Sequence, residues 1–80
     1  MAFEYKLQQI LDELGLESDY QLAQISTVKP QTVKLFLNGE VKRIEMPTLE
    51  KLLKTLNRLA DEKGIDKTYT IDSLVLYLRD

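Results

Sequence analysis

The fold is decided by residues 18–39, which read SDYQLAQISTVKPQTVKLFLNG. Ser18 followed three residues later by Gln21 has the spacing of a capping box, which marks the start of a helix. Pro30 suits the first position of a second helix, because its missing N–H would be unpaired there anyway. The pair Asn38-Gly39 is a helix stop signal. The stretch therefore predicts two short helices joined by a tight turn, over residues 18–25 and 30–38.

The sequence on both sides supplies helices that can pack against this pair. Its apolar residues recur at the spacing i, i+3, i+4, i+7 that places them on one helix face. No segment alternates convincingly with period two, and the length of 80 residues allows one domain. We therefore predict a single all-α domain over residues 1–80, a compact bundle of about five short helices: 3–14, 18–25, 30–38, 47–62 and one that begins near residue 70.

The composition excludes several classes of chemistry. The chain has no Cys and no His, so thiolate nucleophiles, imidazole bases, disulfides and the commonest zinc sites are not available. We therefore expect no enzyme activity, no metal, no cofactor and no small-molecule substrate. No apolar run approaches the roughly 20 residues that span a bilayer. The first residues lack a cationic segment followed by an apolar one, so we expect no membrane contact and a cytoplasmic protein.

Charge is distributed unevenly along the chain. The net charge is -2, yet residues 29–58 hold seven Lys or Arg against three Asp or Glu. Residues 1–28 hold one cation against five acidic residues, and residues 59–80 hold three against five. A basic middle third between two acidic segments predicts one cationic face on an otherwise acidic body.

The second helix of the pair is expected to expose one face. Its buried stripe is Val33, Phe36 and Leu37, and a helix this short is stable only when it is packed by others. The other side chains suit base edges in the major groove, because Gln can pair with adenine, Lys with guanine, and Thr and Leu can contact a thymine methyl. The alternative is an ordinary solvated surface.

The pattern extends beyond the two helices. It comprises Leu22-Ala23, Val28, Thr32-Val33, Asn38-Gly39, Thr48-Leu49 and Leu52-Leu53. Over about residues 4–60 the chain resembles the Cro/CI-type (lambda-repressor-like, XRE) helix-turn-helix DNA-binding family. In that family Ala23 corresponds to the small residue where the two helices touch. Thr27 departs from the family, whose turn usually has glycine here, and this predicts a longer or re-formed turn.

The resemblance implies a function and a set of contact residues. The function is sequence-specific binding of double-stranded DNA by a transcriptional regulator, either a repressor or an antitoxin-like protein. The implied base-reading residues are Gln31, Thr32, Lys34 and Leu35. The implied phosphate-binding residues are Tyr20, Gln21, Asn38, Lys42 and Arg43. The alternative function is a protein-interaction module with the same helical fold and no DNA binding, in which Lys42 and Arg43 belong to an ordinary polar loop.

The last segment, residues 65–80, continues past the resemblance. In the expected helix Ile71, Leu74, Val75 and Leu78 share the buried face. Neighbouring helix positions lie about 100° apart, so Leu76 and Tyr77 would be left on the surface. One helix-turn-helix reads only a few base pairs, and specificity usually requires two copies. We therefore predict a homodimer with contacts by Tyr69, Leu76 and Tyr77; the alternative is a helix that only caps the core of a monomer.

Overall fold

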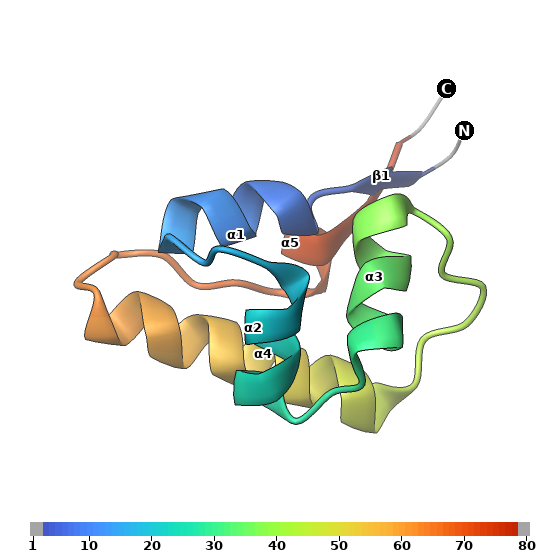
Figure 1. Cartoon of the computed structure of the whole chain (residues 1–80). Coiled ribbons are helices and arrows are strands. Elements are labelled where there is room, and N and C mark those ends of the chain that lie inside the picture. Colours follow the sequence, from blue (N-terminus) through green and yellow to red (C-terminus); the bar gives the residue numbers. More distant parts are fainter. Residues whose placement is uncertain (1–2, 79–80) are drawn as a thin grey trace.

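The predicted helical fold is confirmed by the computed structural model, which describes residues 3–78 (Figure 1). Five helices and one small two-stranded sheet make up this part of the chain. In chain order the elements are β1 (Phe3–Tyr5), α1 (Leu7–Leu14), α2 (Asp19–Ser26), α3 (Pro30–Asn38), α4 (Met46–Glu62), α5 (Ile71–Leu74) and β2 (Val75–Tyr77). The central pair α2 and α3 is the predicted helix-turn-helix.

The boundaries of α2 and α3 are set by the expected capping residues. Ser18 is the N-cap of α2, and its Oγ accepts a hydrogen bond from the backbone N of Gln21 at 3.2 Å. The side chain of Gln21 accepts from the backbone N of Glu17, one residue before the cap, instead of closing the box on Ser18. Pro30 lies in the first turn of α3, and Gly39 ends that helix in the left-handed conformation.

The turn between α2 and α3 stays short, so the predicted longer or re-formed turn is wrong. Thr27 adopts the left-handed conformation that glycine usually supplies, with φ 60° and ψ 21°. Its Oγ1 donates a hydrogen bond to the carbonyl of Ser26 at 2.6 Å. Val28 follows directly and is buried in the core. This burial helps to hold a β-branched residue at a positive φ that strains it.

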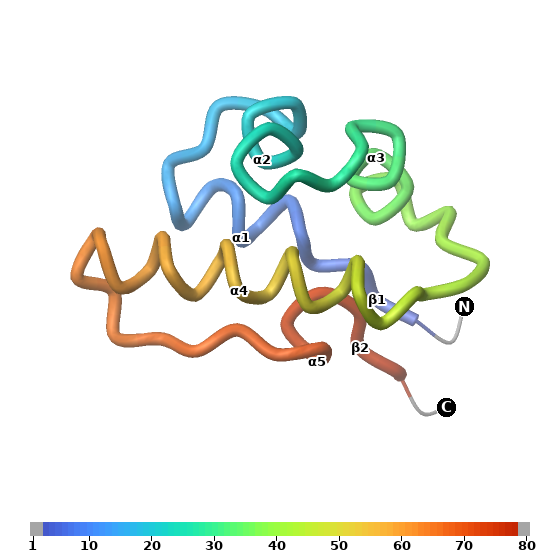
Figure 2. The backbone as a smooth tube through the Cα atoms, turned by 90° about the horizontal axis from the view of Figure 1, so that it is seen from below, coloured from blue at the N-terminus to red at the C-terminus, as the bar shows by residue number. Residues whose placement is uncertain are grey.

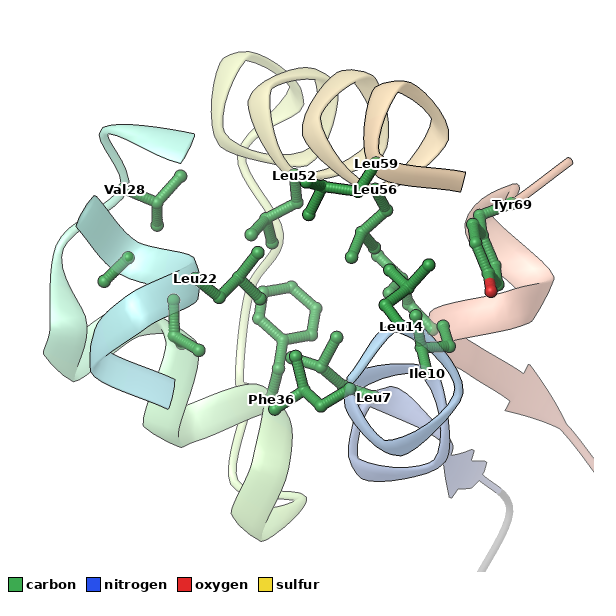
Figure 3. Packing of buried hydrophobic residues seen from close by; sticks show 14 of the residues in the cluster. Leu7, Ile10, Leu14, Leu22, Val28, Phe36, Leu52, Leu56, Leu59 and Tyr69 are labelled. Carbon is green, nitrogen blue, oxygen red and sulfur yellow. The ribbon is translucent and has the colours of Figure 1, made fainter. Parts of the chain in front are cut away.

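The four longer helices share one hydrophobic core (Figure 3). Phe36 of α3 points from its helix toward Leu7 of α1 and Leu22 of α2, and leucines of α4 close the core from the other side. Figure 2 shows that α2 and α3 lie on one side of α4, whereas the chain from 65 to 70 runs along its other side. The outer faces of α2 and α3 are therefore left uncovered.

The fourth helix is the longest, with 17 residues. Its buried leucines repeat at the helical spacing that predicted it, and Pro47 stands in its first turn. Among residues 3–78, no helix combines the length and the apolar character that crossing a membrane requires.

Both ends of the described chain differ from the expected helices. Phe3–Tyr5 is a strand rather than the start of α1, and α5 ends at Leu74, where β2 begins. The two strands pair antiparallel, with Phe3 opposite Tyr77 and Tyr5 opposite Val75. Aromatic and β-branched residues favour such a pairing, and it overrides the weak helical pattern of residues 75–78. The predicted buried face is consequently wrong for two of its members, Ile71 and Leu78, which are exposed.

Tyr69 is a second correction, because the predicted partner-facing residue is only 2% exposed and belongs to the core. The side chain of Asn57 on α4 forms hydrogen bonds with both polar groups of the Tyr69 backbone. Asn57 Nδ2 donates to the carbonyl of Tyr69 at 3.0 Å, and the backbone N of Tyr69 donates to Asn57 Oδ1 at 2.6 Å. This pair fastens the segment before α5 to α4 and directs the Tyr69 ring inward. Leu76 is half-buried, and Tyr77 is 63% exposed.

Candidate nucleic-acid interface

The outer face of α3 collects four of the residues that the sequence singled out. Val33 and Phe36 point into the core, with 0% and 2% exposure, so the opposite side of the helix faces solvent. The residues on that side are spaced i, i+3, i+4, i+7, which places them on one stripe of a helix. They are Gln31, Lys34, Leu35 and Asn38, all of them exposed, and we call them the α3 outer face.

Thr32 lies beside this face rather than on it. It is half-buried and lines a small hollow of about 60 Å³ between α3 and the loop that follows. Leu35, Arg43 and Ile44 line the same hollow. The predicted base-reading residues are therefore brought together along α3, with Thr32 at the edge nearest the loop.

The loop from residue 40 to residue 45 carries the two predicted phosphate anchors, Lys42 and Arg43. Both are exposed, and Figure 1 shows the loop extending beyond α3 on the side away from α2. Within residues 3–78 the ion pairs are Lys54 with Glu50 and a second pair between α1 and the segment before α5. The cations of α3 and its loop are thus unpaired within the described chain and remain available to an anion, although Glu40 and Glu45 at the two ends of the loop offset the charge of Lys42 and Arg43.

At the beginning of α2, the backbone N–H groups of Tyr20 and Gln21 already have side-chain partners. The Oδ1 of Asp19 accepts a hydrogen bond from the backbone N of Tyr20 at 2.9 Å, so a carboxylate occupies this helix end. Gln21 Oε1 accepts from the backbone N of Glu17 at 3.0 Å, which leaves the donor end of that amide facing outward. Tyr20 is 57% exposed. Contacts to an anion here would come from the side chains of Tyr20 and Gln21.

The comparison with protein families decides the identity of this arrangement. The model of the Cro/C1-type HTH DNA-binding domain matches residues 6–58. The chain belongs to the Cro/C1-type helix-turn-helix family. No curated protein and no solved structure matches it.

The family match fixes the function of this Cro/C1-type domain at a general level. It is a double-stranded-DNA-binding domain of the transcription-regulator class, and the family is not one of enzymes. The matched range contains every predicted DNA-contacting residue, from Tyr20 to Arg43. It leaves out β1, α5 and β2, so the small sheet is an addition to the part that the family defines.

A separate polar cluster lies on the Cro/C1-type domain between α1 and the segment before α5. Lys67 Nζ donates to Glu13 Oε2 at 2.7 Å, and this hydrogen bond raises the pKa of Lys67. Burial raises the pKa of Tyr69, whose ring centroid lies 5.5 Å from Lys67 Nζ. Both groups keep their protons near neutral pH, so neither is suited to general acid-base work there.

Sequence reasoning missed one residue that contacts the loop of the predicted phosphate anchors. Tyr5 of β1 donates a hydrogen bond from its Oη to the carbonyl of Val41, in the loop that carries Lys42 and Arg43. The only local signal is the alternation Phe3-Glu4-Tyr5, which is too short to identify a strand.

Proposed function

We propose that this domain is a sequence-specific repressor that inserts α3 into the major groove of an operator. The supporting observation is the α3 outer face, an uncovered stripe of four side chains on the side of the helix opposite its buried stripe. Repression by occupancy needs no surface beyond the DNA interface, and an antitoxin-like regulator would use the same interface. In a bacterial or phage-infected cell, such a protein works in the cytoplasm.

The side chains of α3 suggest which bases are read. Gln31 can bond both N6 and N7 of adenine, and Lys34 can donate to O6 and N7 of guanine. Leu35 can contact a thymine methyl, as can Thr32 at the edge of the face. Good contacts of this kind discriminate by about 1–3 kcal/mol each against the wrong base.

Phosphate contacts are assigned to residues that flank α3. Lys42 and Arg43 follow the helix, Asn38 ends it, and Tyr20 and Gln21 stand at the start of α2. Such contacts set the register of the protein on the duplex and carry no direct sequence information. They release counterions, so affinity should fall steeply as salt rises.

We propose further that two copies bind a twofold-symmetric site. Half-sites are read about 34–36 Å apart along one face of the duplex, and the domain measures 36 × 26 × 22 Å, so two copies can lie side by side at that spacing. For the partner surface we propose residues that differ from those expected from the sequence. Phe3 and Tyr77, whose ring centroids lie 5.5 Å apart, form an exposed aromatic pair at the end of the sheet, whereas the half-buried Leu76 faces the other side of its strand. Tyr69 has no part in it.

Selection of bound duplexes from a random DNA library tests the proposed function. The expected product is a pair of related half-sites whose centres are separated by one helical turn. Enrichment of single half-sites would contradict the dimer and would still support base reading by α3. Recovery of unenriched DNA, with only weak and salt-sensitive binding, would overturn sequence-specific recognition.

A further inference from the structure

The ring of Tyr5 lies against the backbone where α3 ends. A Cβ atom placed on Gly39 would lie 3.2 Å from Cδ1 of this ring, closer than an ordinary van der Waals contact. Gly39 has a φ of 71°, so its backbone is held in a conformation that also favours glycine. The aromatic side chain of β1 and the glycine at the end of α3 are therefore packed directly on each other.

The same ring forms a wall beside the phosphate anchors. Phe3, Tyr5 and Val75 of the sheet line one side of an open hollow of about 320 Å³. Residues 41–44, which include Lys42 and Arg43, line the other side. The sheet thus supports the loop from the flank that faces away from α4.

Few other interactions hold this loop. Glu40 donates its backbone N–H to the carbonyl of Leu35, and regular bonding resumes at the start of α4. Between these points, the hydrogen bond from Tyr5 Oη to the carbonyl of Val41 is the one within the described chain that reaches residues 41–44. Its length of 3.4 Å makes it a weak bond, so the packing of the ring contributes more than the hydroxyl.

We propose that Tyr5 is a positioning residue for DNA binding, which holds loop 40–45 in the conformation that presents Lys42 and Arg43 to phosphate. This inference rests on the proposed function. It assigns a role to β1, which lies outside the range matched by the family, and to β2, because Val75 is paired with Tyr5 and holds it in the sheet. The preformed loop loses less conformational entropy when it binds DNA, so the same cations bind more tightly.

Trypsin tests the positioning without DNA, since it cleaves after Lys42 and Arg43. Cleavage should follow the open population of the loop, and Tyr5→Leu should raise the rate there about tenfold while cleavage after Lys63 is unchanged. Ile71→Ala, which shortens an exposed side chain of α5 outside the hollow, should leave both rates as they are. Equal acceleration at the loop and at Lys63, or none at all, overturns the proposal. If Tyr5→Leu loses its cooperative unfolding, Tyr5→Val decides, because it also removes the ring and keeps a residue that favours strands. An acceleration confined to the loop is the expected result, and unchanged rates are the contrary one.

Binding to the selected duplex then tests the link to phosphate contacts. Tyr5→Leu should reduce the slope of log Kd against log salt by about 1–2, the change expected for one or two lost phosphate contacts. The double change Lys42→Ala with Arg43→Ala should cause little further loss in a Tyr5→Leu background. Independent, additive losses overturn the positioning role. A parent protein that binds no duplex overturns the proposed function instead, and the protease result still reports on the loop.

Discussion

Asn57 and Tyr69 pair through two hydrogen bonds, at 3.0 Å and 2.6 Å, in which a side-chain amide bonds the backbone N–H and carbonyl of a residue twelve positions later. The amide replaces the neighbouring strand that an extended segment would otherwise need. It explains how a stretch without helix or strand can run along α4 and still deliver a buried aromatic ring.

Asn57→Ala should destabilise the domain by about 2–3 kcal/mol, because two hydrogen bonds are lost and two backbone groups are left without their partner. Asn57→Asp keeps an acceptor for the Tyr69 N–H and loses the donor. Its unfolding free energy should therefore lie between those of the parent and Asn57→Ala. Urea unfolding followed by far-UV circular dichroism measures both changes. A loss below half a kcal/mol for Asn57→Ala would show that solvent replaces the amide and that the segment is fastened elsewhere.

Thr27→Gly should stabilise the domain. A β-branched residue in the left-handed region costs about 1–3 kcal/mol, and the greater entropy of glycine in the unfolded chain removes about 0.5–1 kcal/mol of the gain. The lost hydrogen bond to Ser26 reduces it further. We expect a higher midpoint in thermal unfolding, with Thr27→Ala between glycine and the parent. A lower midpoint for Thr27→Gly would mean that the turn is not strained.

Stability should decline in alkaline solution. Lys67 and Tyr69 both have a folded-state pKa raised above the ordinary values of 10.5 and 10.0. Their contributions are therefore complete below pH 10 and are lost as pH rises through the raised values. Tyr69→Phe removes one of the two groups, so its unfolding free energy should fall less between pH 9 and pH 11 than that of the parent. Parallel curves for the two proteins would assign the decline to other groups.

The aromatic pair Phe3 and Tyr77 provides the test of the dimer. Changing both residues to serine removes the apolar surface of the proposed contact. The change replaces no buried residue, since Phe3 and Tyr77 are 49% and 63% exposed. Sedimentation equilibrium at tens of micromolar should change from dimer to monomer. Circular dichroism provides the control, because the helical spectrum should be kept. A parent protein that is already monomeric, with no cooperative binding to a symmetric site, contradicts the dimer.

The parts of the fold that could be predicted are those specified by neighbouring residues. Ser18, Pro30 and Gly39 mark helix ends through bonds and dihedral angles within one turn, and the leucines of α4 repeat over many residues. The buried stripe of α3 then determines its outer face without further information. For this reason Gln31 and Lys34 could be placed on one surface from their spacing alone.

The parts that were missed depend on contacts between distant segments. Phe3 and Tyr77 pair across nearly the whole chain, and each strand has three residues, too few to show an alternating pattern. Tyr69 resembled a surface residue because the amide that binds it, that of Asn57, lies on α4 and is distant in the sequence. Tyr5 could not be connected to Val41 for the same reason, so the support of the loop is visible only once the chain is folded.

Base reading by the α3 outer face is the central claim, and the affinity of single variants for the selected operator and for a scrambled duplex tests it most directly. Gln31→Ala and Lys34→Ala should each weaken operator binding by about 1–3 kcal/mol while scrambled DNA is bound nearly as before. Lys51→Ala, which removes an exposed cation from α4, is the control and should change neither. Equal losses on both duplexes, or none on either, would contradict base reading by α3.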